Sequence, residues 1–125
     1  MTRQIVRTDD APTNPAFSQA VVAGGLIFVS GQGPFDPGSG AIVGATVQEQ
    51  TRQCLTNVSS ILEAAGAGLD RVVSATVILA DPDDFAGMNE EWRRWFPTDP
   101  PARQGARLPV AMPGLRLSIA VIAEA

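Results

Sequence analysis

A single arginine after a stiff, proline-rich turn has the clearest potential for chemistry in this sequence. Arg103 follows Pro100 and Pro101, and each proline fixes its own φ angle. The guanidinium therefore starts from a partly preset backbone, which reduces the entropy lost when it binds an anion. We predict that Arg103 binds an anionic ligand; the alternative is a surface arginine surrounded by solvent.

The residue types that are missing exclude several kinds of catalytic site. The chain has 125 residues and contains no histidine, no lysine and no tyrosine. A pyridoxal Schiff base and a Walker-type phosphate loop both require lysine. A Ser-His-Asp triad, a Cys-His pair and a histidine-ligated metal site all require histidine. We therefore expect a site that uses no cofactor and no metal.

Charge and hydropathy limit the partners. The net charge is −4, so a nucleic-acid groove would have to be assembled from scattered arginines, and we expect no nucleic-acid partner. No apolar run is long enough to span a membrane. The N-terminal residues 1–7 include two arginines and lack the apolar core of a signal peptide. A lone cysteine excludes an internal disulfide. We expect a cytoplasmic protein with no membrane partner.

Two other groups of reactive side chains have structural explanations. Cys54 lies on the apolar stripe of a predicted helix, where a buried thiol is favoured over a nucleophile because nothing nearby would lower its pKa. The run Asp81–Asp84 contains three carboxylates and one proline. Such a cluster can bind a metal, but capping at the start of a helix explains it better.

Residue patterns predict a chain of alternating strands and helices. The expected strands are residues 4–7, Ser18–Val22, Leu26–Ser30, Ala41–Val43, Leu69–Leu79 and Leu115–Ile122. The second and third of these form a hairpin turning at Gly24 and Gly25. A capping box of Thr46 and Glu49 starts the first helix, which ends near Gly66. A second helix runs from about Asp81. The expected order is β-β-β-β-α-β-α-β-β, in which the strand directly after the second helix is not assigned to particular residues.

Two helices can cover only one face of a sheet of about six strands. In the second helix, Phe85, Met88, Trp92 and the Trp95-Phe96 pair form the predicted buried stripe. In the last strand, alternate residues beginning at Leu115 face the helices. The others, Arg116, Ser118, Ala120 and Ile122, face away. This second set is neither polar enough for water nor apolar enough for a separate core, which predicts a closed homo-oligomer with sites between subunits.

Five short segments, each weak evidence alone, form a series along the chain. They are Asn14–Ala20, Ile27–Gln32, Gln50–Gln53, Asp84-Phe85 with Asn89, and Pro100–Arg103. In this order and spacing the sequence resembles the reactive intermediate deaminase family, also called Rid or YjgF. The resemblance implies one Rid-like domain over residues 1–125, with an α/β (α+β), chorismate-mutase-like fold, and a homotrimer with three clefts between subunits. It also implies hydrolysis of 2-imino or enamine acids to 2-oxo acids and ammonia.

The resemblance also implies roles for individual residues. Arg103 matches the arginine that binds the substrate carboxylate, and a planar guanidinium suits that group. The other positions that line the family's cleft are Phe17, Ser30, Gly31, Asn89 and Gly105. Phe17 stands where many members have tyrosine, and Gly105 where many have cysteine. From the residues alone, Asn89 is either an exposed helix residue or one at the edge of a cleft.

The last strand departs from the family pattern. Deaminating members have a glutamate there that orients the attacking water, and this chain has Ser118 in its place. A hydroxyl can hold a water molecule but is a poor general base. The leading hypothesis is still an imine or enamine deaminase that uses Arg103 and Ser118. The alternatives are a non-catalytic module that binds a small carboxylate and a different pathway-specific deaminase or tautomerase.

Overall fold

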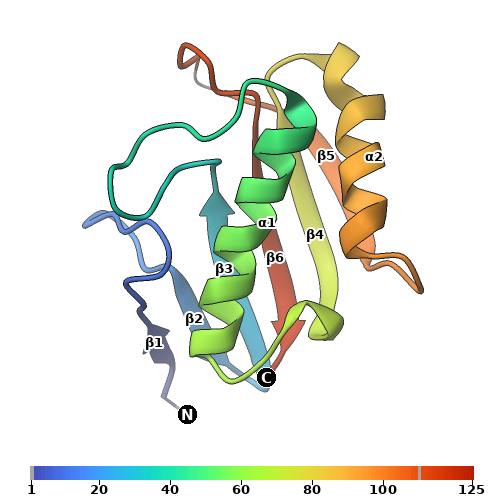
Figure 1. Ribbon diagram of the computed structural model, residues 1–125. Helices are drawn as coiled ribbons and strands as arrows, with labels where there is room; N and C mark the ends of the chain where they lie inside the picture. The colour runs from blue at the N-terminus through green and yellow to red at the C-terminus, as the bar shows by residue number, and fades with distance from the viewer. Residues whose placement is uncertain (1, 110) are drawn as a thin grey trace.

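The computed structural model describes residues 2–109 and 111–125 as a sheet covered by two helices (Figure 1). The helices are α1 (Val47–Ala64) and α2 (Phe85–Trp95), and short 3-10 turns at Leu69–Arg71 and Pro82–Asp84 precede a strand and α2 respectively. The strands are β1 (Gln4–Val6), β2 (Ala20–Ala23), β3 (Leu26–Gln32), β4 (Val72–Leu79), β5 (Ala102–Arg107) and β6 (Leu117–Glu124).

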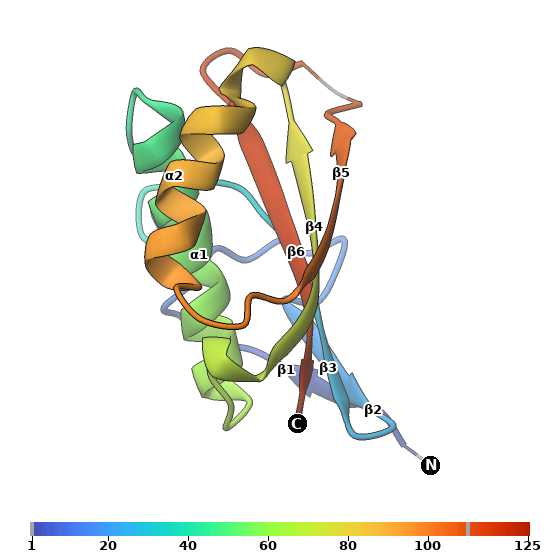
Figure 2. The same cartoon turned by 90° about the vertical axis from the view of Figure 1, so that its right-hand side faces the viewer.

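The six strands form one mixed sheet in the order β1-β2-β3-β6-β4-β5. Among the described strands, only β4 and β5 run parallel to each other, and α2 makes the crossover that parallel neighbours require. Both helices lie on the same side of the sheet (Figure 2). The predicted fold, a six-stranded mixed sheet with two helices on one face, is therefore confirmed.

The predicted capping of α1 is present in full. The Thr46 hydroxyl accepts a hydrogen bond from the Glu49 backbone N–H, and the Glu49 carboxylate accepts one from the Thr46 backbone N–H. Past the other end of the helix, Gly66 has a φ of +82°, which favours glycine. The predicted hairpin turn is also present, with Gly24 and Gly25 at positive φ.

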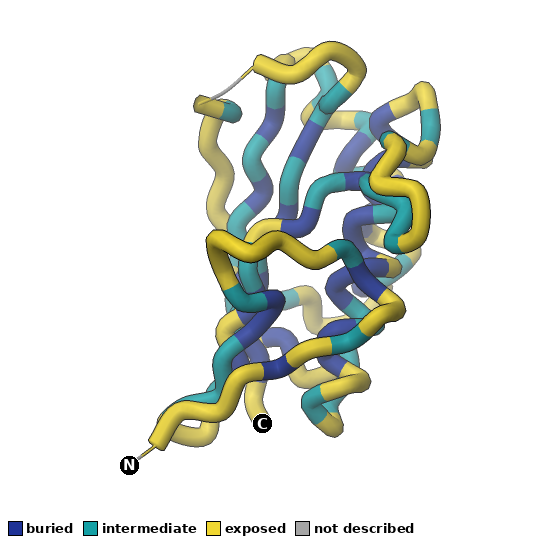
Figure 3. The backbone as a smooth tube through the Cα atoms, turned by 90° about the vertical axis from the view of Figure 1, so that its left-hand side faces the viewer, coloured by how far each residue is buried: buried dark blue, intermediate teal, exposed yellow. Residues whose placement is uncertain are grey.

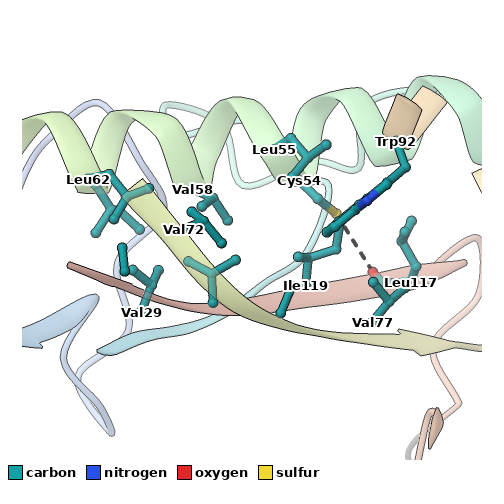
Figure 4. Close-up of a cluster of buried hydrophobic side chains, with 14 of the residues drawn as sticks. Val29, Cys54, Leu55, Val58, Leu62, Val72, Val77, Trp92, Leu117 and Ile119 are labelled. Carbon is teal, nitrogen blue, oxygen red and sulfur yellow. Dashed lines mark hydrogen bonds between the residues drawn. The ribbon is translucent and has the colours of Figure 1, made fainter. Parts of the chain in front are cut away.

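The core lies between the helices and the sheet (Figure 4). Leu55, Val58 and Ile119 are fully buried there. Cys54 is fully buried beside them, with its Sγ 4.0 Å from the Leu117 carbonyl oxygen. Burial raises the pKa of the Cys54 thiol, so the thiolate needed for nucleophilic attack is suppressed. The prediction of a structural cysteine is confirmed.

Buried and less buried residues alternate along the strands (Figure 3). In β6 the buried set points toward the helices, and Ser118, Ala120 and Ile122 lie on the other face. Strand pairing places Ile122 opposite Phe28, and Phe28 opposite Val21, which makes an apolar row across three strands. The Phe28 side chain remains 43% exposed. We call the sheet face opposite the helices the open face.

Several sequence predictions are wrong in detail. The expected strand at Ala41–Val43 is reduced to one bridge between Phe35 and Ile42. The first three residues of the expected strand Leu69–Leu79 form a 3-10 turn, and the last strand begins at Leu117, two residues later than predicted. The residues before Leu117 do not pair as a strand. The backbone N–H of Arg116 instead donates a hydrogen bond to the Gln50 side chain, which links this loop to α1.

Two side chains point elsewhere than predicted. Arg116 was expected on the open face, but it pairs with Asp84 at 3.1 Å and donates to the Ala45 carbonyl oxygen, so it joins the segments just before α2 and α1. Phe85 was expected in the core, but its side chain is 53% exposed. Nowhere in the described residues is a helix both long and apolar enough to cross a membrane.

Candidate functional site between alpha2 and beta5

Arg103 lies on β5, the edge strand, with its side chain directed toward α2. Its register partner on β4 is Ala75, a buried residue of the helix-covered face. The guanidinium carbon lies 5.0 Å from the centre of the Trp92 ring and 5.7 Å from that of Phe85. Its Nη1 atom is 3.7 Å from the Met88 sulfur. Aromatic rings attract a cation through their faces, so α2 holds this charge without a carboxylate.

The charge of Arg103 is partly removed from water. Among the ion pairs of the described residues, Arg52 binds Glu91 and Arg116 binds Asp84, whereas Arg103 has no carboxylate. Desolvation lowers the pKa of the Arg103 guanidinium, yet arginine stays charged in proteins. A cation that is partly buried and lacks an acidic neighbour is suited to an anionic ligand.

Two hollows meet at Arg103. One, of about 600 Å³, lies between α2 and β5 and contains Gly105 in its wall. The other, of about 410 Å³, is bordered by Asn89, Trp92 and the Pro100-Pro101 pair. The predicted site residues Arg103, Asn89 and Gly105 therefore lie close together. Asn89 lies at the edge of a hollow, which agrees with its interpretation as a residue at the edge of a cleft.

A second group of predicted residues lies on β3 and β6. The Ser30 hydroxyl donates to the Ser18 carbonyl oxygen at 2.6 Å, so its lone pairs remain available as acceptors. A Cβ atom added to Gly31 would lie 2.9 Å from the Ser118 Oγ, which shows how closely these two residues approach. The β3–β6 register shifts between Val29 and Gln32, and such irregularities often redirect side chains at functional sites.

Phe17 belongs to this second group through its neighbour Ser18. Its backbone N–H donates to the Asn14 carbonyl oxygen at 3.4 Å, and its ring is 53% exposed. The exposed ring is available to form one wall of a binding surface. Phenylalanine lacks the hydroxyl that a tyrosine would have at this position, but its ring can still form a wall of the cleft.

One chain does not bring the two groups together. Strand β4 separates β5 from β6, so Arg103 and Ser118 are at least roughly 10 Å apart across the sheet at the usual strand spacing. Arg103 also faces the helices, whereas Ser118 lies on the open face. A site that used both residues would need two copies of the chain.

The sequence did not identify the residues that hold Arg103. Phe85, Met88 and Trp92 recur at helical spacing, a pattern that predicts a core stripe. Met88 and Trp92 are indeed buried, but both also contact the guanidinium. The residue types gave one indication of this role. A sulfur and two aromatic rings on one face of a helix can pack in the core and also surround a cation.

The Asp81–Asp84 run is explained by local structure. The Asp81 side chain accepts from the Asp83 backbone N–H and caps the turn that leads into α2. Asp84 is paired with Arg116. Across residues 2–109 and 111–125, no cluster of three or more acidic, cysteine or histidine side chains is arranged to hold a metal ion.

Known proteins resemble the chain along nearly its whole length. The family model described as Endoribonuclease L-PSP matches residues 8–125. The 2-iminobutanoate/2-iminopropanoate deaminase of Capra hircus is 40% identical over 124 residues, covering 98% of this chain and 90% of that protein. A RutC family protein of Pyrococcus horikoshii is 43% identical over 111 residues, covering 86% and 88% respectively.

A solved structure shares the fold as well. Escherichia coli TdcF with bound serine superposes with a TM-score of 0.89 at 33% identity, covering 98% of each chain. The sheet order, the two helices on one face and the sequence matches lead to the same result. The chain belongs to the reactive intermediate deaminase (Rid, YjgF) family, whose model carries the description Endoribonuclease L-PSP.

Proposed function

We propose that this protein hydrolyses 2-imino or enamine carboxylic acids to 2-oxo acids and ammonia. The observation that carries the proposal is Arg103 at the junction of two hollows. Trp92 and Met88 hold its guanidinium, and among residues 2–109 and 111–125 it has no carboxylate partner. Its planar fork would bind the substrate carboxylate through two charge-assisted hydrogen bonds. Asn89, beside it, would supply a neutral hydrogen-bonding group.

The complete site would form between two copies of the chain in a homotrimer. In this assembly the Arg103 group of one copy would face the second group of the next copy, which consists of Phe17, Ser30, Gly31 and Ser118. Two observations support this arrangement: the groups lie on opposite faces of one chain, and the open face carries the apolar row Val21–Phe28–Ile122. Burying that row would stabilise the assembly by removing apolar surface from water.

The reaction needs only a bound substrate and a placed water molecule. Water attacks C2 of the imine, and the electrons of the C=N bond move to nitrogen. The resulting amino alcohol transfers a proton to the amine, the C–N bond breaks, and ammonia leaves as the 2-oxo group forms. The imine carbon is already electrophilic, so positioning accounts for much of the catalysis. The Ser118 and Ser30 hydroxyls would hold the water, and no cofactor enters the scheme.

The related proteins support this proposal more than a nuclease role. The goat relative is named as a deaminase of 2-iminobutanoate and 2-iminopropanoate, and the TdcF structure contains serine, an amino acid with a carboxylate. The family description mentions ribonuclease activity. This chain has no histidine and a net charge of −4, which does not favour binding and cleaving a polyanion.

The direct test is ammonia release from an imino acid made in the assay. An amino acid oxidase converts an L-amino acid into the 2-imino acid, and semicarbazide traps whatever imine remains. We expect the protein to lower the amount of trapped imine and to raise the rate of 2-oxo acid formation in proportion to its concentration. No acceleration with any 2-imino acid would contradict the proposed reaction.

The proposed assembly predicts the mass in solution. We expect light scattering at micromolar concentration to give three times the 13.1 kDa of one chain. Ile122→Arg, which places a charge in the apolar row of the open face, should convert the trimer to monomers because an unpaired buried charge is strongly unfavourable. Glu124→Arg changes charge at an exposed end of the same strand and serves as control. A monomeric wild-type protein would contradict the shared site.

A further inference from the structure

The larger hollow beside Arg103 has the character of a side-chain pocket. It has a volume of about 600 Å³, within the usual range for small-molecule sites. Most of its lining is apolar. The lining residues are Val77, Leu79, Pro82, Phe85, Met88 and Ala106, together with Gly105 and the three polar residues Arg103, Gln104 and Arg107.

The hollow exists because one position of β5 has no side chain. Arg103, Gly105 and Arg107 alternate along the strand on the side that faces α2, and Gly105 is in register with Val77. A Cβ atom at Gly105 would lie 3.3 Å from the Val77 carbonyl oxygen, closer than ordinary contact. Any larger side chain there would extend into the space under α2. The missing side chain therefore creates the floor of the hollow.

The opposite wall is an exposed aromatic ring. The Phe85 side chain is 53% exposed although it begins a helix whose Met88 and Trp92 are buried. Phe85 lines the hollow together with other apolar residues, so its exposed ring is available to contact the hydrocarbon part of a ligand. Met88 lies one turn further along the helix, and its sulfur makes a flexible, polarisable inner surface.

The anchor for a carboxylate lies at one end of this hollow. Arg103 lines both the apolar hollow and the polar one that contains Asn89. A 2-imino acid has a carboxylate and an imine at one end and a hydrocarbon side chain at the other. With its carboxylate on Arg103, its polar end fits the side of Asn89 and its side chain fits the apolar side. The polar and the apolar hollow on either side of Arg103 therefore match the polar and the hydrocarbon end of a 2-imino acid.

We propose that the apolar hollow between α2 and β5 binds the side chain of a bulky substrate, a 2-imino acid with a branched aliphatic or aromatic group. This inference rests on the proposed function and adds a preference for size. A three-carbon substrate would leave the hollow filled with water. Each additional methylene buried there should strengthen binding about fourfold.

The test uses 2-oxo acids, the stable products, as probes of the full-length protein. Calorimetric titration with pyruvate, 4-methyl-2-oxopentanoate and phenylpyruvate should show affinity increasing in that order. Phenylpyruvate should bind on the order of 10²-fold more tightly than pyruvate. The same order is expected in kcat/KM for the imino acids made from alanine, leucine and phenylalanine.

Two variants probe the two walls. Gly105→Val fills the floor, and Phe85→Ala removes the exposed ring, which is a surface change that the fold should tolerate. Both should reduce the ratio of phenylpyruvate to pyruvate affinity to less than about tenfold. Ala86→Val adds bulk at an exposed position of α2 that does not line the hollow, and it should keep the wild-type ratio.

The outcomes separate this inference from the proposed function. Equal affinity for pyruvate and phenylpyruvate would overturn the size preference while leaving the deaminase proposal intact. Tighter binding of 2-oxoglutarate than of phenylpyruvate would also overturn it, because it would mean that Arg107, and not the apolar wall, selects the substrate. Failure to bind any 2-oxo acid, together with no turnover of any imino acid, would contradict both proposals.

Discussion

Replacing Arg103 by alanine is expected to lower kcat/KM for a 2-imino acid by about 10³-fold, because two charge-assisted hydrogen bonds to the carboxylate are lost. Arg103→Lys keeps the charge but loses the planar fork, so its loss should be smaller, about 10-fold to 10²-fold. The measurement is imine hydrolysis with enzymatically generated substrate, with 2-oxo acid binding determined in parallel. Both variants should lose affinity along with activity.

The control for Arg103 must separate ligand binding from assembly. Arg3 is an exposed arginine just before β1, and Arg3→Ala removes the same charge far from the α2–β5 hollows. It should retain both activity and 2-oxo acid binding. Light scattering should give the same mass for all variants, since Arg103 contacts α2 of its own chain. If the Arg103→Ala protein still binds and hydrolyses the substrate normally, the guanidinium is not part of the site.

Local sequence signals predicted the helices and turns because each depends on neighbouring residues. The Thr46–Glu49 capping box and the Gly24–Gly25 turn are formed as expected. The order of strands in the sheet depends on pairing between distant segments, and local patterns do not determine it. β6 lies between β3 and β4, and β4 in turn lies between the strand that carries Ser118 and the strand that carries Arg103.

The sequence indicates candidate residues for the proposed site but not the residues that surround them. The proline-rich turn and the guanidinium at Arg103 are visible in the sequence, as is the family resemblance. The exposure of Phe85 is not visible in the sequence, because helical spacing alone does not tell which end of an apolar stripe lies outside the core. Phe85 lines a hollow next to the edge strand β5, and Gly105 of that strand lines the same hollow. Only the three-dimensional arrangement shows this proximity.

Ser118→Glu is expected to raise kcat for imino acid hydrolysis by about 10²-fold, since a positioned general base typically contributes 10²-fold to 10⁴-fold. Ser118 is half-buried on the open face, and glycine at position 31 leaves its side chain room. A carboxylate there can accept a proton from the attacking water, which a neutral hydroxyl does poorly. The wild-type site, on this view, binds its ligand well and turns it over slowly.

The pH dependence and an isosteric variant identify the cause of the gain. A glutamate with an ordinary pKa of about 4.3 is ionised at neutral pH, so the advantage of Ser118→Glu should be present near pH 7 and lost as the pH falls through that value. Ser118→Gln has the same shape without the charge and should show no gain. If glutamate and glutamine behave alike, this position does not act on the water.

A second outcome concerns the natural protein. In this outcome, wild-type protein binds 2-oxo acids without turnover while Ser118→Glu turns the substrate over. In that case the anion site is complete and only the base is missing, so the natural protein is a carboxylate-binding member of the family.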